Sequence, residues 1–267
     1  MVRALIAGIF IGLCCSLIGV FIVLRKMAFF SDAIAHSSLA GVAISLLFGA
    51  NTIAIALLFS VAIALGIGYM NKKTPLSIDT IIGIFFSGAM ALAVIIISFI
   101  SGYQPDLISY LFGNILAITG SDLILAILIG IFSVAIILVL LKSYLFLTID
   151  RDGAKIIGLK TTLLDYLFLA LLALVVVASI RIVGVILVSA LIIVPPATAK
   201  NVCRNFAQMV YLSMFFGVIS VVGGLVLSYY INAPSGAVIV LFSLAIFITT
   251  AIAKTIATTV KKHTVNI

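Results

Sequence analysis

The sequence predicts an all-α, polytopic membrane protein that forms a single transmembrane domain over residues 1–267. Hydrophobic residues make up 65% of the chain and charged residues 8%, and the mean hydropathy is +1.49. A soluble domain averages about 25% charged residues, so this chain cannot present a surface suited to water. Its apolar runs are long and continuous, as helical spans of about 20 residues require, whereas a β-barrel alternates apolar and polar residues in short segments.

Nine apolar runs predict nine transmembrane helices. They cover residues 2–24, 33–50, 52–70, 80–100, 122–141, 161–180, 182–200, 207–230 and 235–256. The first run is not a signal peptide, because it lacks a small-residue cleavage site and is followed by many more spans. A shorter apolar segment, 106–118, precedes the fifth run and predicts a short external helix that does not span.

The basic residues predict an external N-terminus and a cytoplasmic C-terminus, since cytoplasmic loops of membrane proteins are enriched in Lys and Arg. With this orientation only Arg3 and Arg181 lie outside. The other 13 basic residues lie at cytoplasmic ends: Arg25, Lys26, Lys72, Lys73, Lys142, Arg151, Lys155, Lys160, Lys200, Arg204, Lys254, Lys261 and Lys262. Arg181 leaves a very short external turn before the 182–200 segment, which is the weak point of the nine-span count.

Two spans carry residues that indicate close packing or a break. Ala4, Gly8, Gly12 and Ser16 recur every four residues in the first span, and small residues at this spacing allow helix backbones to approach closely. The partner helix is either in a second copy or, more simply, in the same chain. Pro195 and Pro196 predict an interruption of the seventh span, because proline removes an amide donor.

The longest polar stretch, 148–160, predicts a short amphipathic helix on the cytoplasmic side. Asp150 and Asp152 begin it and lysines end it, which is the charge order that the helix dipole favours. Gly158 is a plausible stop, because glycine readily adopts the left-handed conformation that ends many helices.

Asp32 and His36 are the candidate metal ligands. They are four residues apart, so on a helix they share one face. Ionisable groups at membrane depth pair, face a cavity or serve function. A carboxylate oxygen and an imidazole nitrogen suit a borderline divalent metal such as zinc. Alternatively, Asp32 caps the helix and His36 bonds to a neighbouring helix.

The other polar residues have simpler interpretations. Asp79 is expected to cap the fourth span, and Asp165 to pair with Lys160 or Lys142. Asp106 and Asp122 are expected in a solvated external loop, and His263 in a solvated basic tail. Cys14 and Cys15 are adjacent and so point in different directions, which makes packing a better interpretation than metal binding.

The sequence lacks the motifs of an enzyme. It has no Gly-rich phosphate loop ending in Lys-Ser/Thr, no HExxH and no GxSxG, so ATP hydrolysis and proteolysis are not expected of this chain.

Several segments together resemble the permease subunits of bacterial metal ABC importers, which serve zinc, manganese and iron uptake. The family's first-loop signature is similar to Arg25-Lys26-Met27 followed by Asp32, His36 and Gly41-Val42-Ala43. Further similar segments are 78–84, the external 106–114, the proline-containing 183–199 and the last external turn, 233–236. The resemblance extends nearly from end to end.

Within this family the chain is most similar to the zinc branch, by its segments 106–122 and 183–209. Two positions depart from the family pattern. Pro196 stands where relatives usually have Ala, and Asn232 stands where many have Asp. The second change removes a charge near the external mouth, so the last loop is left out of the metal site.

The resemblance implies a homodimer in the bacterial inner membrane, with two copies of an ATP-binding subunit inside and a metal-binding protein outside. Asp32 and His36 are then the metal site, and zinc is the transported substrate rather than a cofactor. Segment 150–159 becomes the coupling helix, with Asp150, Ala154, Ile156, Gly158 and Leu159 toward the ATPase. The external protein is expected to dock on Asp106, Tyr110 and Asn114, and the basic tail 257–267 adds contacts or serves topology alone.

The expected mechanism is alternating access through a weak, transient metal site. Two ligands per chain are too few for tight structural zinc, and a transport site must release its ion. The first alternative is the same machine carrying manganese or iron, since Asp and His also bind those ions. A second alternative is a proton-coupled secondary transporter, which needs no ATPase.

Overall fold

The computed structural model describes residues 2–100 and 120–265, and every regular element within them is an α-helix. Polytopic helical architecture is thereby confirmed. The helices are α1 (Val2–Leu24), α2 (Phe30–Phe48), α3 (Thr52–Lys73), α4 (Ile78–Ser98), α6 (Gly120–Val139), α7 (Leu141–Ile149), α8 (Arg151–Ile156), α9 (Thr161–Val183), α10 (Val185–Val202), α11 (Phe206–Ile231) and α12 (Ser235–Val265). The segment predicted as an external helix, 106–118, lies outside the described residues.

The predicted spans agree with these helices. Eight described helices are long and apolar enough to cross a membrane, and a ninth span results if α6 and α7, bent by 65° at their junction, are taken as one. The weak 182–200 segment is α10, which meets this criterion with 18 residues. Gly184 separates it from α9 with a φ of +84°, a conformation that glycine adopts without steric cost.

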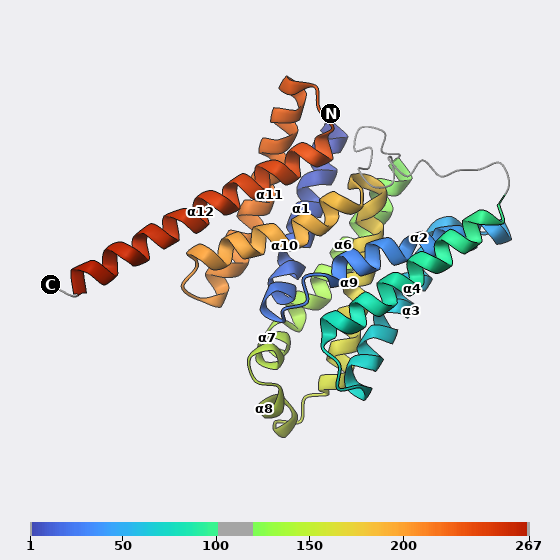
Figure 1. Ribbon diagram of the computed structural model, residues 1–267, viewed down its shortest axis with the longest axis horizontal. Helices are drawn as coiled ribbons and strands as arrows, with labels where there is room; N and C mark the ends of the chain where they lie inside the picture. The colour runs from blue at the N-terminus through green and yellow to red at the C-terminus, as the bar shows by residue number, and fades with distance from the viewer. Residues whose placement is uncertain (1, 101–119, 266–267) are drawn as a thin grey trace.

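The helices pack in two groups around α1 and α9 (Figure 1). One group contains α1, α10, α11 and α12, and the C-terminal end of α12 projects away from it. The other contains α2, α3, α4 and α9, with α6 packed on both α9 and α1. Most of the inward-facing side chains of α1 and α9 belong to one hydrophobic core, while α4 and α12 expose long apolar faces, as lipid contact requires.

The predicted interruption at Pro195 and Pro196 is wrong, because α10 runs through both prolines. Proline at position 196 removes the amide that would bond to the Ile192 carbonyl four residues earlier. That carbonyl instead faces α1 at Gly19, where a Cβ atom would lie only 1.9 Å from the Ile192 oxygen. A glycine on the neighbouring helix therefore lets α1 approach the unbonded carbonyl, and the helix continues.

The small-residue face of the first span packs within the same chain, against α11. A Cβ on Gly12 would lie 3.1 Å from Val221, and a Cβ on Gly217 would overlap the Ser16 hydroxyl. Ser213 donates a hydrogen bond of 2.8 Å to the Ser16 carbonyl. The face is thus occupied by an internal neighbour, and the dimerisation alternative is not needed to explain it.

We expect Gly19→Ala to destabilise the protein by about 2 kcal/mol or more, since the new methyl group meets a backbone carbonyl that cannot rotate away. Gly88→Ala is the matched control, because a Cβ there has no neighbour within 4 Å. Thermal unfolding of the purified protein in detergent measures both. Equal melting temperatures for the two variants would contradict the close α1–α10 approach.

Candidate functional site

Asp32 and His36 lie in the first and second turns of α2, as the spacing predicted. The N-cap of α2 is Phe29, and no side-chain bond caps the helix, so Asp32 is not a capping residue. Its carboxylate still lies near the positive end of the helix dipole, which stabilises a negative charge. Neither side chain is fully buried.

The two side chains line one pocket of about 450 Å³ between α2 and α4. Its lining residues are Phe29, Asp32, Ala33, His36, Asp79, Ile82, Gly83 and Phe86. The His36 ring meets Phe86 edge to face, with centroids 5.3 Å apart and planes at 89°. Its Nδ1 atom is buried and has no hydrogen-bond partner, so the expected bond to a neighbouring helix is absent at this atom.

Asp79 also lines this pocket, although only a capping role was predicted for it. The predicted cap is wrong: Ser77 is the N-cap of α4, and its hydroxyl accepts a hydrogen bond from the Thr80 amide at 3.2 Å. Asp79 is instead an exposed carboxylate in the first turn of α4. Its place beside α2 comes from helix packing, and the only sequence signal for it is one acid at the start of an apolar helix.

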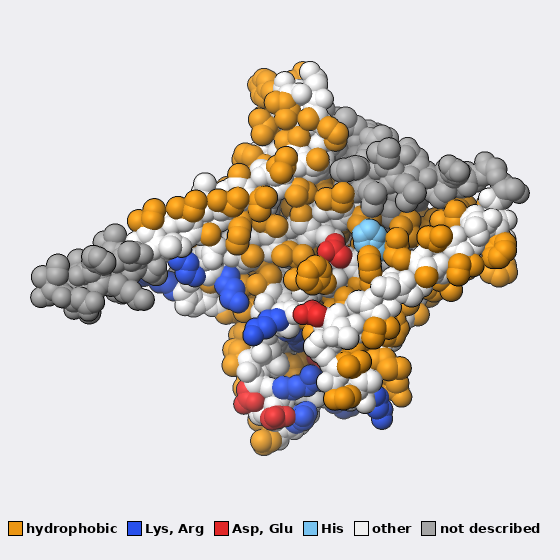
Figure 2. Space-filling model, viewed as in Figure 1, with side chains coloured by type: hydrophobic (Ala, Val, Ile, Leu, Met, Phe, Trp, Pro, Cys, Tyr) orange, Lys and Arg blue, Asp and Glu red, His pale blue; other side chains and the backbone are white. Residues whose placement is uncertain are grey.

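The pocket offers a sparse set of metal donors. Among the residues whose side chains the structure describes, no three His, Cys or acidic side chains lie close enough to hold one ion. Figure 2 shows a histidine and an acidic side chain on a largely hydrophobic face, with Lys and Arg along the lower side of the view, from α12 to the end that carries α7 and α8. One carboxylate and one imidazole give weak binding of a divalent cation, which suits a transient site.

The predicted cytoplasmic helix is present as α8, shorter than the predicted 150–159. Asp150 caps it by accepting a hydrogen bond of 2.9 Å from the Gly153 amide. The chain leaves it through Gly158, which has a φ of +81° as the predicted stop requires. The hydrogen bond from Lys155 lowers the pKa of Asp152, but both side chains are exposed and such a pair adds little stability.

The residues expected to face the ATPase point in different directions. Ala154 is fully buried, and Leu159 is half-buried against the main core. Ile156, at the end of α8, is 86% exposed, and its neighbour Ile157 and Ile149, at the end of α7, are also exposed. We call these three exposed apolar side chains the isoleucine surface.

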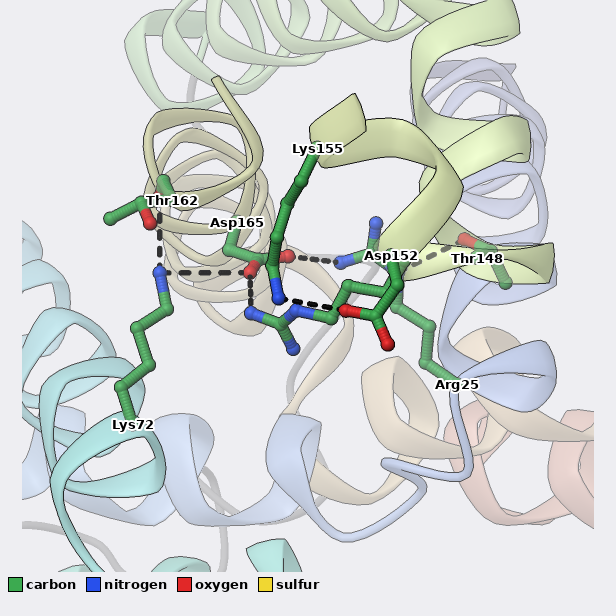
Figure 3. A network of polar contacts seen from close by, with 8 residues as sticks. Arg25, Lys72, Thr148, Asp152, Lys155, Thr162 and Asp165 are labelled. Atoms are coloured by element: carbon green, nitrogen blue, oxygen red, sulfur yellow. Dashed lines mark hydrogen bonds and ion pairs between the residues drawn. The ribbon is translucent and has the colours of Figure 1, made fainter. Parts of the chain in front are cut away.

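Asp165 in α9 joins three cations from three other parts of the chain (Figure 3). Its Oδ2 lies 2.7 Å from Arg151 Nη2 and 3.7 Å from Lys72 Nζ, and its Oδ1 lies 3.3 Å from Arg25 Nη1. The predicted pairing with Lys160 or Lys142 is wrong. Helix packing brings the C-terminal ends of α1 and α3 to α9. Arg25 and Asp165 are 140 residues apart in the sequence, so a single sequence could not predict that they are in contact.

Arg25 is the most enclosed of these cations. Its guanidinium lies 4.7 Å from the centre of the Phe168 ring, and its Nε donates a hydrogen bond to Thr148 at 3.2 Å. Burial lowers the pKa of Arg25, and the Asp165 carboxylate opposes this shift. The Arg25 guanidinium stays charged because the Asp165 carboxylate and the face of the Phe168 ring compensate for its lost hydration.

The structure does not test most of the remaining predicted positions. Asp106, Tyr110 and Asn114 lie outside the described residues, as do the side chains of Asp122 and His263. Cys14 and Cys15 are buried in the core between helices, so their packing role is confirmed.

Comparison with known proteins identifies the family. The model of the ABC 3 transport family matches residues 1–254. The chain is 41% identical over 245 residues to the manganese transport system membrane protein MntC of Listeria innocua, covering 92% of this chain and 87% of that protein. It is 32% identical over 248 residues to the high-affinity zinc uptake system membrane protein ZnuB of Haemophilus influenzae, covering 92% and 94%.

A solved structure agrees with the fold as well as with the sequence. PsaBC from Streptococcus pneumoniae, in complex with Fab, contains a chain that is 35% identical, with a TM-score of 0.81 and coverage of 93% of this chain and 89% of that one. The helical bundle of this chain agrees with these relatives. The chain belongs to the ABC 3 transport family and is a multi-pass membrane permease of a metal importer.

Proposed function

We propose that this permease carries manganese into the cytoplasm by alternating access, through a transient site that contains Asp32 and His36. The observation that carries the proposal is the pocket that these two side chains line together on α2. A carboxylate and an imidazole therefore line the same pocket. The relatives of this chain are named as manganese and zinc transport proteins. Asp79 provides a further carboxylate in the same pocket.

We propose manganese rather than zinc as the substrate because this chain is more similar to the manganese transport protein than to the zinc protein. The manganese protein MntC is 41% identical to this chain, whereas the zinc protein ZnuB is 32% identical. The zinc expectation from the sequence therefore has weaker support than its alternative. The donors agree with manganese, since carboxylate oxygens suit this ion and the pocket is lined by no cysteine. Zinc binds such ligands more strongly, so it is the competing substrate to test.

We propose that a separate ATP-hydrolysing subunit drives transport, in two copies on a homodimer of this chain. The chain has no phosphate loop of its own, and the isoleucine surface is apolar, exposed and next to charged residues, as a protein contact requires. An external metal-binding protein completes the system, with docking at Asp106, Tyr110 and Asn114 kept as a prediction. The proton-coupled alternative differs because it transports without ATP.

The proposed orientation has the N-terminus outside and the C-terminus in the cytoplasm. Three of the 13 basic residues assigned to the cytoplasm, namely Arg25, Lys72 and Arg151, meet at Asp165. Because all three contact one carboxylate, these contacts support the assignment of Arg25, Lys72 and Arg151 to the same side of the membrane. The isoleucine surface is then on the cytoplasmic side, where an ATPase is accessible.

We expect Asp32→Asn and His36→Ala each to reduce manganese uptake at least about tenfold, because a two-donor site loses half of its ligands. The measurement is ATP-dependent uptake of radioactive manganese by proteoliposomes with the complete three-component system. His263→Ala, which removes the other histidine of the chain, is the matched control. Normal uptake by both pocket variants, at normal protein stability, would mean that Asp32 and His36 have only structural roles.

We expect Ile156→Asp to lower ATP-dependent uptake about tenfold, because burying a charge against the ATPase opposes docking. Ile156→Val preserves an apolar side chain and should keep uptake near normal. Co-purification of the ATPase subunit and its hydrolysis rate are measured with uptake. Full uptake and full co-purification with Ile156→Asp would remove the isoleucine surface from the proposed ATPase contact.

The substrate itself is tested by competition in the same proteoliposomes. We expect manganese uptake to exceed zinc uptake when both are supplied at equal free concentration with the native external binding protein. Measurement without the binding protein shows whether the permease contributes to the preference, since a sparse site discriminates poorly. Zinc uptake above manganese uptake would restore the zinc assignment and leave the permease role unchanged.

A further inference from the structure

Asp165 connects the ATPase side of the molecule with the helix that carries the metal site. Arg151 is the first residue of α8, and its guanidinium binds Oδ2 of Asp165 at 2.7 Å. Arg25 is the residue after α1, and its guanidinium binds Oδ1 of the same carboxylate at 3.3 Å. One side chain of α9 is therefore held from both directions (Figure 3).

Arg25 is tied closely to α2 through a short, tight turn. Lys26 follows it with a φ of +57°, which non-glycine residues rarely adopt. The Met27 amide then donates to the Ile22 carbonyl, and the Phe30 amide donates to the Met27 carbonyl, where α2 begins. Asp32 lies two residues further on, so a displacement of Arg25 has little chain in which to be absorbed before the metal pocket.

The contacts of Asp165 differ in how readily they can be exchanged. The Arg25 side chain is only 12% exposed and is also held by Thr148 and Phe168. The Arg151 side chain is 46% exposed, and Lys72 Nζ already forms a longer ion pair, 3.7 Å, with the same oxygen that Arg151 binds. Arg151 is thus the contact that a moving α8 can release, and Lys72 is placed to replace it.

The surroundings leave room for such an exchange. A pocket of about 460 Å³ lies beside the three cations, lined among others by Lys26, Met27 and Thr148. Three cations share a single carboxylate, so like charges repel one another as soon as that carboxylate is neutralised or moves.

We propose that Asp165 is a positioning residue that transmits the movement of α8 to the Arg25–Lys26 turn and so to Asp32 and His36. The inference rests on the proposed coupling of this permease to an ATPase. When the ATPase displaces α8, Arg151 leaves Oδ2 and the ion pair of Lys72 with that oxygen shortens, which draws α3 toward α9. Arg25 stays on Oδ1 and carries the shift of α9 to the start of α2.

The test measures manganese ions imported per ATP hydrolysed, in proteoliposomes that contain the permease, its ATPase subunit and its external binding protein. The variants are Asp165→Asn, Arg151→Gln and the two together. Arg151→Gln leaves the buried Arg25 contact intact, so it separates transmission from folding. Lys73→Gln is the matched control, because it removes an exposed charge next to Lys72 that makes no ion pair with Asp165.

We expect Arg151→Gln and Asp165→Asn each to lower this ratio about tenfold, the loss typical of one charge-assisted hydrogen bond. The double variant should be no worse than Asp165→Asn alone, since both changes break one link. Lys73→Gln should keep the normal ratio, and Arg151→Gln should keep the normal melting temperature.

Two results would overturn the inference. One is a normal ratio with Arg151→Gln while Asp165→Asn lowers only the melting temperature, which would make Asp165 a structural anchor. The other is additive losses in the double variant. Absence of ATP-dependent uptake by the unaltered complex would instead refute the proposed function, and the inference with it.

Discussion

Every buried polar group of this protein faces the same constraint: the bilayer core offers no water to satisfy it. Backbone groups meet this constraint by forming helices, which explains why the described elements are helical throughout. Charged side chains meet it in two ways that divide the molecule. Asp165 is surrounded by cations at the end of the bundle, whereas Asp32 opens into a pocket. The first arrangement holds helices together, and the second leaves a carboxylate available to a cation.

Helix association in this environment depends on close backbone approach, because lipid tails are as apolar as the side chains they touch. The contact of Gly19 with the Ile192 carbonyl shows this most clearly. A proline on α10 leaves that carbonyl without its usual donor, and a glycine on α1 allows the two helices to close over it. Gly12 and Gly217 serve the same purpose between α1 and α11. These close approaches hold α1, α10 and α11 tightly together.

The pocket lined by Asp32 and His36 and the Asp165 cluster are connected by a few residues of chain, and the proposed transmission between them depends on this short connection. Weak binding at Asp32 and His36 is useful only if it changes between two states of the transporter. In the proposed mechanism the Arg25–Lys26 turn carries that change, since it begins at the Asp165 cluster and ends at the first turn of α2. In the proposed mechanism, the group that binds the ion, on α2, is separate from the group that responds to the ATPase, on α9.

Much of the fold followed from the sequence alone, because long apolar runs admit few structures in a bilayer. The runs predicted the spans, the Asp32–His36 spacing predicted a shared face, and Gly158 predicted the end of α8, since each depends on local chain geometry. The partners of Asp165, the place of Asp79 in the metal pocket and the continuous α10 were decided only by tertiary structure. Each depends on which helices become neighbours, and one sequence contains no periodicity that reveals contacts between distant segments.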